Sequence, residues 1–487
     1  MVNRKLIFKI IGSLLLLEAL FMLICVGMAI FFAHIDLIPF IASTCITLAA
    51  GMMLLRQSRG APSMMNRRDS YAVVTLTWLT FSIFGALPYL FSGIINNPTD
   101  AFFETMSGFT TTGASVLNDV ESQLGSHRSL LFWRSLSQWI GGLGIVFFTI
   151  AVLPSMVGGS MKVFSAEATG PIRSKMHPRL STNAKWIWSV YLALTIACCL
   201  SYLLAGMDWF SAANYAMTTT ATGGFSIHND SIGHFHSSAI EYIGMLFQFA
   251  CGVNFTLLYL LIMKRRIKAF LKNSELRFYA LLVVVCSVWI MLVLLFHNGY
   301  DFEHAFRSAT FHVVSLMTTT GIFCDNVGSW PHITWIILSV LMFIGACAGS
   351  TSGGFKSIRM LMIWKVIRNE FIRLLHPRAV LPVRINGQAL PSPMVQNLLA
   401  FFAIYVVALL ITTAVMMTLD FNVTNSVVIS LSCINNVGLP LNELGPDMTW
   451  NDLPFFAKWM CSLLMLMGRL EIFSVLLLFT PSYWKDN

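Results

Sequence analysis

The sequence predicts an all-α membrane protein, with ten transmembrane helices and four re-entrant segments arranged as four pseudo-repeats around one pore. Hydrophobic residues fill 56% of the 487 positions and charged residues only 11%, whereas a soluble domain needs more charge to cover its surface. The mean hydropathy is +0.72. The apolar residues come in runs of about twenty, which is the length that crosses a bilayer core of roughly 30 Å. Internal repetition between these runs predicts the fourfold arrangement.

The first apolar run follows Arg4, Lys5 and Lys9. It is too long for the apolar region of a signal peptide and lacks a small-residue cleavage site, so we expect a retained first helix. Ten runs are expected to span the membrane, at residues 10–32, 37–55, 71–93, 131–153, 185–205, 240–263, 277–297, 333–348, 395–418 and 455–479.

Basic and acidic residues alternate between successive loops. Basic residues gather in segments 56–68, 162–185, 264–277 and 356–384, and acidic residues lie in the segments between them. By the positive-inside rule the basic segments are cytoplasmic, and ten spans then place both termini in the cytoplasm. The net charge of +9 is explained by this orientation, so membrane lipid and not nucleic acid is the expected surrounding.

The outer segments each contain a short helical stretch that opens near an acidic residue, at Asp100, Asp208, Asp301 or Asp420. An acidic residue at that position can cap a helix that enters the membrane from outside. The stretches are too short to span, which predicts re-entrant segments whose irregular ends line protein or a water-filled cavity.

Each short stretch leads into a run that contains glycine, and the runs divide the chain into similar units. We expect an additional N-terminal helix pair at residues 1–69, followed by pore repeats at 70–160, 183–266, 275–375 and 390–480, the third with an interrupted second helix. The runs are Thr110, Thr111, Thr112 and Gly113; Thr220, Ala221, Thr222 and Gly223; Thr318, Thr319, Thr320 and Gly321; and Asn435, Asn436, Val437 and Gly438.

These residue types suit a pore for a dehydrated monovalent cation. K⁺ needs a ring of oxygen atoms that replaces its hydration shell, and inward-facing backbone carbonyls supply such a ring without a fixed charge. Glycine permits the unusual backbone angles required, and threonine adds a hydroxyl group to a stiff backbone. We therefore expect K⁺ ions to bind at the four runs, and we expect no covalently bound cofactor.

An acidic residue follows each run, at Asp119, Asp230, Asp325 and Glu443. Such a ring would concentrate cations at the outer mouth, although solvated loop charges are an equally good interpretation. Three histidines, His228, His234 and His236, also lie on an outer loop and could bind a metal, but their spacing fits no evident helix.

Two features suggest a gate below the runs. The third repeat contains a stretch without large side chains, from Gly345 through Gly349, Ser350, Thr351, Ser352 and Gly353 to Gly354. So many glycines disfavour a helix, which predicts a flexible intramembrane loop, with close helix packing as the alternative. Arg469 lies in the last span, where a charge is costly and often functional. It either faces the pore or is neutralised by loop carbonyls, since Glu471 is poorly placed to pair with it.

These motifs resemble the Trk/Ktr/HKT superfamily of K⁺ transporters, with the Trk-type membrane subunit (TrkH type) closest, over nearly the whole chain. The two helices before residue 70 favour the Trk type. In that family one glycine per repeat forms a degenerate K⁺ filter, and all four are retained here, which implies K⁺. The resemblance also implies a bacterial cytoplasmic (inner) membrane location, a loop that closes the pore, a homodimer and a cytoplasmic nucleotide-binding regulatory subunit (TrkA type).

Two other classes of function fit the sequence less well. An H⁺- or Na⁺-coupled secondary carrier, such as a symporter, usually has paired and often inverted halves with broken helices, whereas these repeats are fourfold and share one orientation. A membrane enzyme would need a catalytic cluster, and no metalloprotease-type HExxH motif occurs. We expect a channel-like translocator and not an enzyme.

Overall fold

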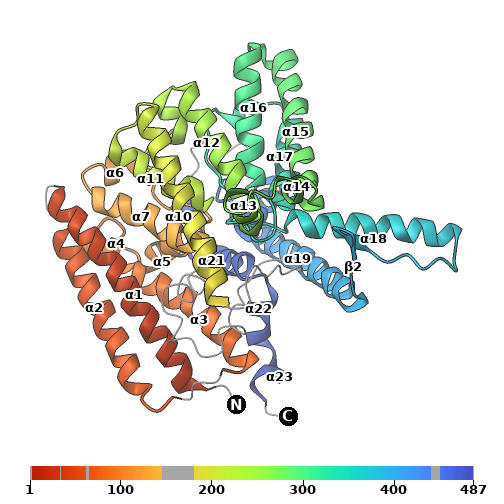
Figure 1. Cartoon of the computed structure of the whole chain (residues 1–487). Coiled ribbons are helices and arrows are strands. Elements are labelled where there is room, and N and C mark those ends of the chain that lie inside the picture. The colour runs from red at the N-terminus through yellow and green to blue at the C-terminus, as the bar shows by residue number, and fades with distance from the viewer. Residues whose placement is uncertain (1–2, 33–34, 62–64, 145–179, 440–449, 486–487) are drawn as a thin grey trace.

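The computed structural model describes residues 3–32, 35–61, 65–144, 180–439 and 450–485, and these are mostly helical. Helices α1 (Arg4–Phe31) and α2 (Leu37–Gln57) form a pair at one edge, against α3 (Arg67–Gly85) and α4 (Leu87–Ser92) (Figure 1). A Cβ on Gly12 would meet the Gly51 carbonyl at 2.9 Å. Glycine therefore lets these two helices approach closely, as small residues do between membrane helices.

The described residues contain fewer long spans than the ten expected. The described part of the chain has six helices that are long and apolar enough to cross a membrane, or eight if each of two bent pairs is one span. Two other expected spans remain. The span expected at 131–153 begins within α7 (Arg128–Gly142), and its second half lies outside the described residues. The other is α17 (His332–Ile344), which has only 13 residues. The chain is a multi-pass membrane protein, while the count of ten stays a prediction.

Two expected spans are broken. α12 (Ser238–Cys251) and α13 (Phe255–Ile262) meet at 105°, and α21 (Phe455–Arg469) meets the segment Phe473–Phe479 at 114°. At the first break Asn254 caps α13, because its side chain accepts a hydrogen bond from the Thr256 amide. The expectation of continuous helices over 240–263 and 455–479 is therefore wrong.

Four short helices lie where the re-entrant stretches are expected: α5 (Pro98–Phe109), α11 (Trp209–Ala221), α16 (Phe302–Met317) and α20 (Val423–Asn435). Asp208 and Asp301 are N-caps, as expected, and accept hydrogen bonds from backbone amides of the first turn. At the other two helices the caps are Asn97 and Asn422. The expectation that Asp100 and Asp420 cap these helices is wrong, since asparagine oxygens three residues earlier and two residues later take that role.

The remaining elements are further long helices and the short segments that connect them. The longer ones are α10 (Leu180–Leu204), α15 (Ser274–Val293), α18 (Ser357–Leu375) and α19 (Ser392–Thr418). The short ones are α6 (Val120–Leu124), α14 (Ile267–Leu271), α22 (Phe473–Leu476), α23 (Pro481–Trp484), η1 (Ser231–Phe235), η2 (Leu294–Asn298), η3 (Val327–Ser329), η4 (Trp450–Asp452) and η5 (Leu477–Phe479).

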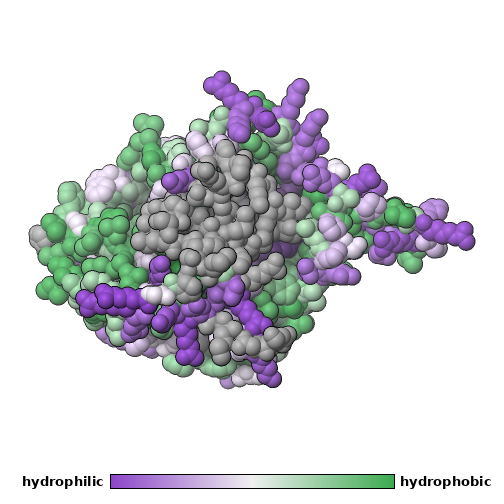
Figure 2. Space-filling view, turned by 60° about the horizontal axis from the view of Figure 1, so that its bottom comes forward, coloured by the Kyte–Doolittle hydropathy of each residue, from purple (hydrophilic) through white to green (hydrophobic). Residues whose placement is uncertain are grey.

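An arm formed by α18 projects from the helical body, beside the antiparallel strands β1 (Arg384–Ile385) and β2 (Gln388–Ala389) (Figure 1). Hydrophilic and hydrophobic side chains are mixed on this arm, whereas hydrophobic ones cover the flank of α1 and α2 (Figure 2). The two ends of the chain lie close together (Figure 1), where the Arg68 side chain donates to the Lys485 carbonyl at 2.8 Å.

Asn254→Ala tests the break between α12 and α13. Asn254 also donates to the Ala348 carbonyl at 2.6 Å, so the variant loses both a cap and a partly buried hydrogen bond. We expect a loss of about 2–3 kcal/mol in the free energy of unfolding, measured by denaturant titration in detergent. The matched cap variant Asn273→Ala should lose about 1 kcal/mol. Equal losses would contradict this role of Asn254.

Candidate functional site

The four short helices all end in the same kind of turn. The turn residue has a positive φ in each case, 53° at Thr111 and Thr222, 57° at Thr319 and 56° at Asn436. The next residue then donates its amide to the carbonyl five positions earlier, at 2.7–3.0 Å. These pairs are Thr112 to Ser107, Gly223 to Thr218, Thr320 to Ser315 and Val437 to Ser432. Residues 110–113, 221–224, 318–321 and 435–438 are therefore equivalent, and we call them the four glycine turns.

This equivalence corrects the alignment of the second run. The residue that matches Gly113 is Gly224 (φ 85°) and not Gly223, because α11 continues through Ala221 before the turn. Thr220 consequently lies inside the helix, where its hydroxyl contacts the Thr195 hydroxyl at 3.0 Å. A Thr-Gly pattern in the sequence concealed this shift, since Thr222 precedes two glycines.

The four glycine turns close into a ring. A Cβ on Gly113 would lie closer than 3.0 Å to the carbonyl oxygen of Gly223 in the next turn. The same holds around the ring, for Gly224 with Thr320, Gly321 with Val437, and Gly438 with Thr112. Each glycine therefore combines a left-handed backbone with a carbonyl neighbour that excludes a side chain.

A cavity of about 330 Å³ lies beside the ring and is lined by all four of these glycines. Asp119 also lines it, and hydrogen bonds from the Asn229 side chain and the Ser122 amide lower the Asp119 pKa to about 2. Asp230 and Asp325 are not among the lining residues, and Asp325 approaches His304 at 3.7 Å. Glu443 lies outside the described residues, so the acidic ring stays a prediction.

Two buried oxygen atoms at equivalent turn positions are unused. The Thr111 hydroxyl and the Asn436 side-chain oxygen have no hydrogen-bond partner among the described residues. The Asn436 amide group donates instead to the Thr112 hydroxyl at 3.0 Å and to the Met465 carbonyl at 2.8 Å. A buried oxygen without a partner is costly, and a dehydrated cation is one species that would satisfy it.

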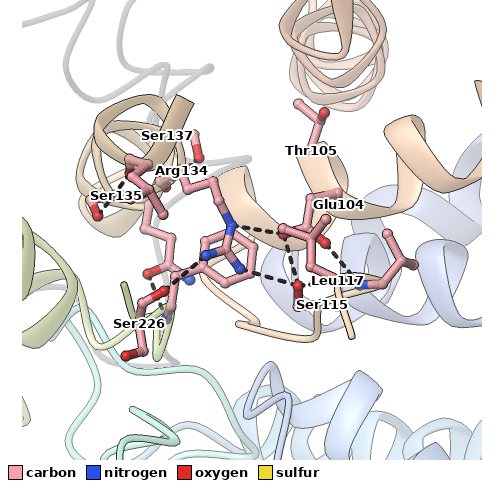
Figure 3. A network of polar contacts seen from close by, with 12 residues as sticks. Glu104, Thr105, Ser115, Leu117, Arg134, Ser135, Ser137 and Ser226 are labelled. Atoms are coloured by element: carbon pink, nitrogen blue, oxygen red, sulfur yellow. Dashed lines mark hydrogen bonds and ion pairs between the residues drawn. The ribbon is translucent and has the colours of Figure 1, made fainter. Parts of the chain in front are cut away.

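A buried ion pair supports the first turn (Figure 3). Arg134 on α7 donates to Glu104 on α5 at 2.9 Å, to the Ser115 hydroxyl at 3.1 Å and to the Ser226 carbonyl at 2.8 Å. Glu104 also accepts from the Val116 amide at 2.9 Å. The pair thus holds the segments that follow two neighbouring glycine turns. Glu104 was not singled out from the sequence, although a carboxylate inside a short membrane helix is a usable signal.

Gln138, one turn along α7 from Arg134, braces the second turn directly. Its amide group donates to the Gly223 carbonyl at 2.6 Å, and its oxygen accepts from the Phe225 amide at 3.1 Å. A Cβ on Gly223 would lie 2.5 Å from this side chain. Position 223 must therefore be glycine to leave room for the Gln138 side chain, whereas position 224 must be glycine because of the Thr320 carbonyl in the ring.

The glycine-rich loop, residues 345–354, packs against the glycine turns. Its Gly353 amide donates to the Thr319 hydroxyl at 2.6 Å, and its Thr351 hydroxyl donates to the Thr220 carbonyl at 3.1 Å. A Cβ on Gly353 would lie closer than 3.0 Å to the Asn435 carbonyl. Gly345, Gly349 and Gly354 have positive φ values of 71–77°, so the segment is an irregular loop and not a close-packed helix.

Arg469 lies beside this loop at the end of α21. It donates to the Thr351 carbonyl at 2.9 Å and to the carbonyls of Gly141 and Gly142 at the end of α7. Loop carbonyls were among the partners expected for it. Glu471 lies 2.6 Å from Arg359. Lys356 was expected among the basic residues of the loop segment 356–384, but it is 2% exposed and donates to the Ser352 carbonyl of the glycine-rich loop.

Comparisons with known proteins agree on one group. The family model described as "TrkH: Cation transport protein" matches residues 38–486. The Trk system potassium uptake protein TrkH of Halomonas elongata is 35% identical, covering 99% of this chain and 100% of that protein. The TrkH protein of Escherichia coli strain K12 is 38% identical over 91% of each. The crystal structure of the potassium transporter TrkH from Vibrio parahaemolyticus superposes with a TM-score of 0.89 at 33% identity, covering 99% of each chain.

Arg134→Leu tests the buried support. The change leaves Glu104 charged, buried and without its guanidinium partner, so we expect about 3–5 kcal/mol lower stability to unfolding. Arg373→Leu removes a cation from an exposed pair with Glu370 and should cost less than about 1 kcal/mol. Comparable losses in the same denaturant titration would argue against a supporting role for Arg134.

Proposed function

Because this chain belongs to the TrkH family of cation transport proteins, we propose that it takes up K⁺ across a bacterial cytoplasmic membrane through a channel-like pore. The ring of four glycine turns carries the proposal, since it brings together residues from four separated parts of the chain. Relatives named potassium uptake proteins support the choice of K⁺. The protein is then a transporter and not an enzyme, with both termini in the cytoplasm.

The proposed K⁺ sites use the backbone carbonyls of the glycine turns. Four carbonyls, of Thr112, Gly223, Thr320 and Val437, occupy matching places around the ring, each against the glycine of a neighbouring turn. Equivalent oxygens from four segments of one chain suit a dehydrated K⁺. The unused oxygens of Thr111 and Asn436 supply further ligands on the side of the glycine-rich loop.

The proposed gate is the glycine-rich loop together with Arg469. The loop contacts three of the four short-helix ends, through Thr220, Thr319 and Asn435, and so obstructs the path beyond the ring. Arg469 ties the loop to α7 and adds positive charge that repels cations. The closed conformation is thus held by hydrogen bonds to backbone carbonyls, which can exchange for water when the loop moves.

The proposed partners are a second copy of this chain and a nucleotide-binding regulatory subunit of the TrkA type on the cytoplasmic side. The projecting arm of α18, which carries Arg368 and Arg373, offers basic side chains to such a partner. An H⁺- or Na⁺-coupled carrier is not favoured, because a single ring of four similar turns differs from the paired halves of such carriers.

Gly113→Ser tests the filter. A serine Cβ would push against the Gly223 carbonyl and displace one ligand of the ring, so we expect K⁺-over-Na⁺ discrimination to fall by about tenfold or more, equivalent to about 1.4 kcal/mol. The measurement is ⁸⁶Rb⁺ uptake into proteoliposomes competed with K⁺ or Na⁺. Gly299→Ser is the matched control, because Gly299 also has a positive φ (68°) but has no heavy atom within 4 Å of its Cβ position. Unchanged competition in Gly113→Ser would contradict the filter assignment.

Arg469→Ala tests the gate. Loss of the charge and of three carbonyl contacts should raise ⁸⁶Rb⁺ uptake several-fold in liposomes without a regulatory partner, because both the barrier and the tie to α7 disappear. Arg469→Lys keeps the charge and should stay close to the unmodified protein. A gate role would be refuted by uptake that is equal in Ala and Lys variants.

A further inference from the structure

Three potential metal ligands from two outer loops lie together, and one of them, His228, lines the cavity that the ring glycines also line. Glu121 on α6, His228, and His234 on η1 each offer one ligand atom, and these atoms lie within 4.8 Å of one another. The Nδ1 atoms of His228 and His234 are 2.6 and 3.7 Å from the same Glu121 oxygen. The two imidazole rings stack in parallel at 3.7 Å. All three side chains keep access to solvent, with exposed fractions of 22–43%.

Contacts within the two loops fix these ligands in place. The Asn229 side chain accepts from the Val120 amide at 2.9 Å and donates to Asp119 at 2.7 Å, which joins the loop of His228 to the start of the helix that carries Glu121. Phe235 packs edge-on against both imidazoles, at 5.5 and 5.4 Å. The three ligands are therefore held close before any ion arrives.

The stacked histidines favour neutral rings. Two protonated imidazoles stacked at 3.7 Å would repel each other. Neutral imidazole is the form that binds metals. A set of two imidazoles and one carboxylate suits Zn²⁺ and related transition metals, whereas Mg²⁺ and Ca²⁺ prefer oxygen ligands alone.

We propose that Glu121, His228 and His234 form a binding site for a transition-metal dication of the Zn²⁺ class, which bridges the outer loops of the first two repeats. Ligand atoms around one tetrahedral Zn²⁺ at about 2.0–2.1 Å lie roughly 3.3 Å apart. The present spacings of 2.6 and 3.7 Å from the Glu121 oxygen are close to that value. Binding also requires the two rings to tilt out of their parallel stack, so that the lone pairs of both nitrogens point at one ion. The ion takes the place of the direct contact between His228 Nδ1 and Glu121, and water completes its coordination.

A bound dication would act on the pore entrance. His228, Asn229 and Asp119 line the cavity that also contacts the four ring glycines, so the ion adds two positive charges next to the path of an entering cation. This effect rests on the proposed K⁺ uptake. We expect Zn²⁺ in the external medium to reduce ⁸⁶Rb⁺ uptake, and equal Mg²⁺ to leave it unchanged, because the field at an entrance controls the local cation concentration.

The binding test uses isothermal titration calorimetry of the purified full-length protein with ZnCl₂, which needs no transport activity. Glu121→Gln and His234→Asn should each weaken Zn²⁺ binding by at least about tenfold, as loss of metal-site contacts does. His236→Asn is the matched control, because His236 lies two residues from His234 and outside the three-ligand group. It should bind Zn²⁺ as the unmodified protein does.

Zn²⁺ binding that is absent, or that persists unchanged in His234→Asn and Glu121→Gln, would overturn the site. Binding that is lost in these variants, without any ⁸⁶Rb⁺ uptake by the unmodified protein, would support the site while contradicting the proposed function. Inhibition of uptake by Zn²⁺ that disappears in His234→Asn but remains in His236→Asn would support both the site and its effect on the entrance.

Discussion

The close approach of each ring glycine to the carbonyl of the next turn is the contact on which this architecture depends. Four segments from distant parts of one chain can meet around an axis only if no side chain projects between them, and the left-handed backbone at the same positions already favours glycine. The contacts around the ring are consistent with this requirement. Arg134 and Gln138 hold the segments that leave the ring, and the glycine-rich loop, also without large side chains, packs against its other side.

Buried polar groups are organised so that backbone carbonyls near the ring face cationic or amide donors. Arg469 and Lys356 donate to carbonyls of the glycine-rich loop, and Glu104 is balanced by Arg134. Such groups are costly in a membrane unless they are satisfied. The contacts of Arg469 and Lys356 account for the interruption of α17, since a continuous helix would consume the carbonyls of Thr351 and Ser352 that these contacts use.

Much of this organisation could be predicted from the sequence, because hydropathy marks the helices and glycine marks the turns. The caps at Asp208 and Asp301 were predictable for the same local reason. The register of the second turn was not, because two adjacent glycines, Gly223 and Gly224, serve different neighbours that lie far away in sequence. The helix breaks also depend on long-range contacts, such as that of Asn254 with the loop. Local patterns carry no information about either.

Anomalous scattering from Rb⁺ in crystals of this protein tests the central claim most directly, since it locates the permeating ion without reference to rates. The account predicts Rb⁺ on the axis of the ring, within coordination distance of the carbonyls of Thr112, Gly223, Thr320 and Val437. Rb⁺ bound only away from that axis, with none among these carbonyls, would contradict it.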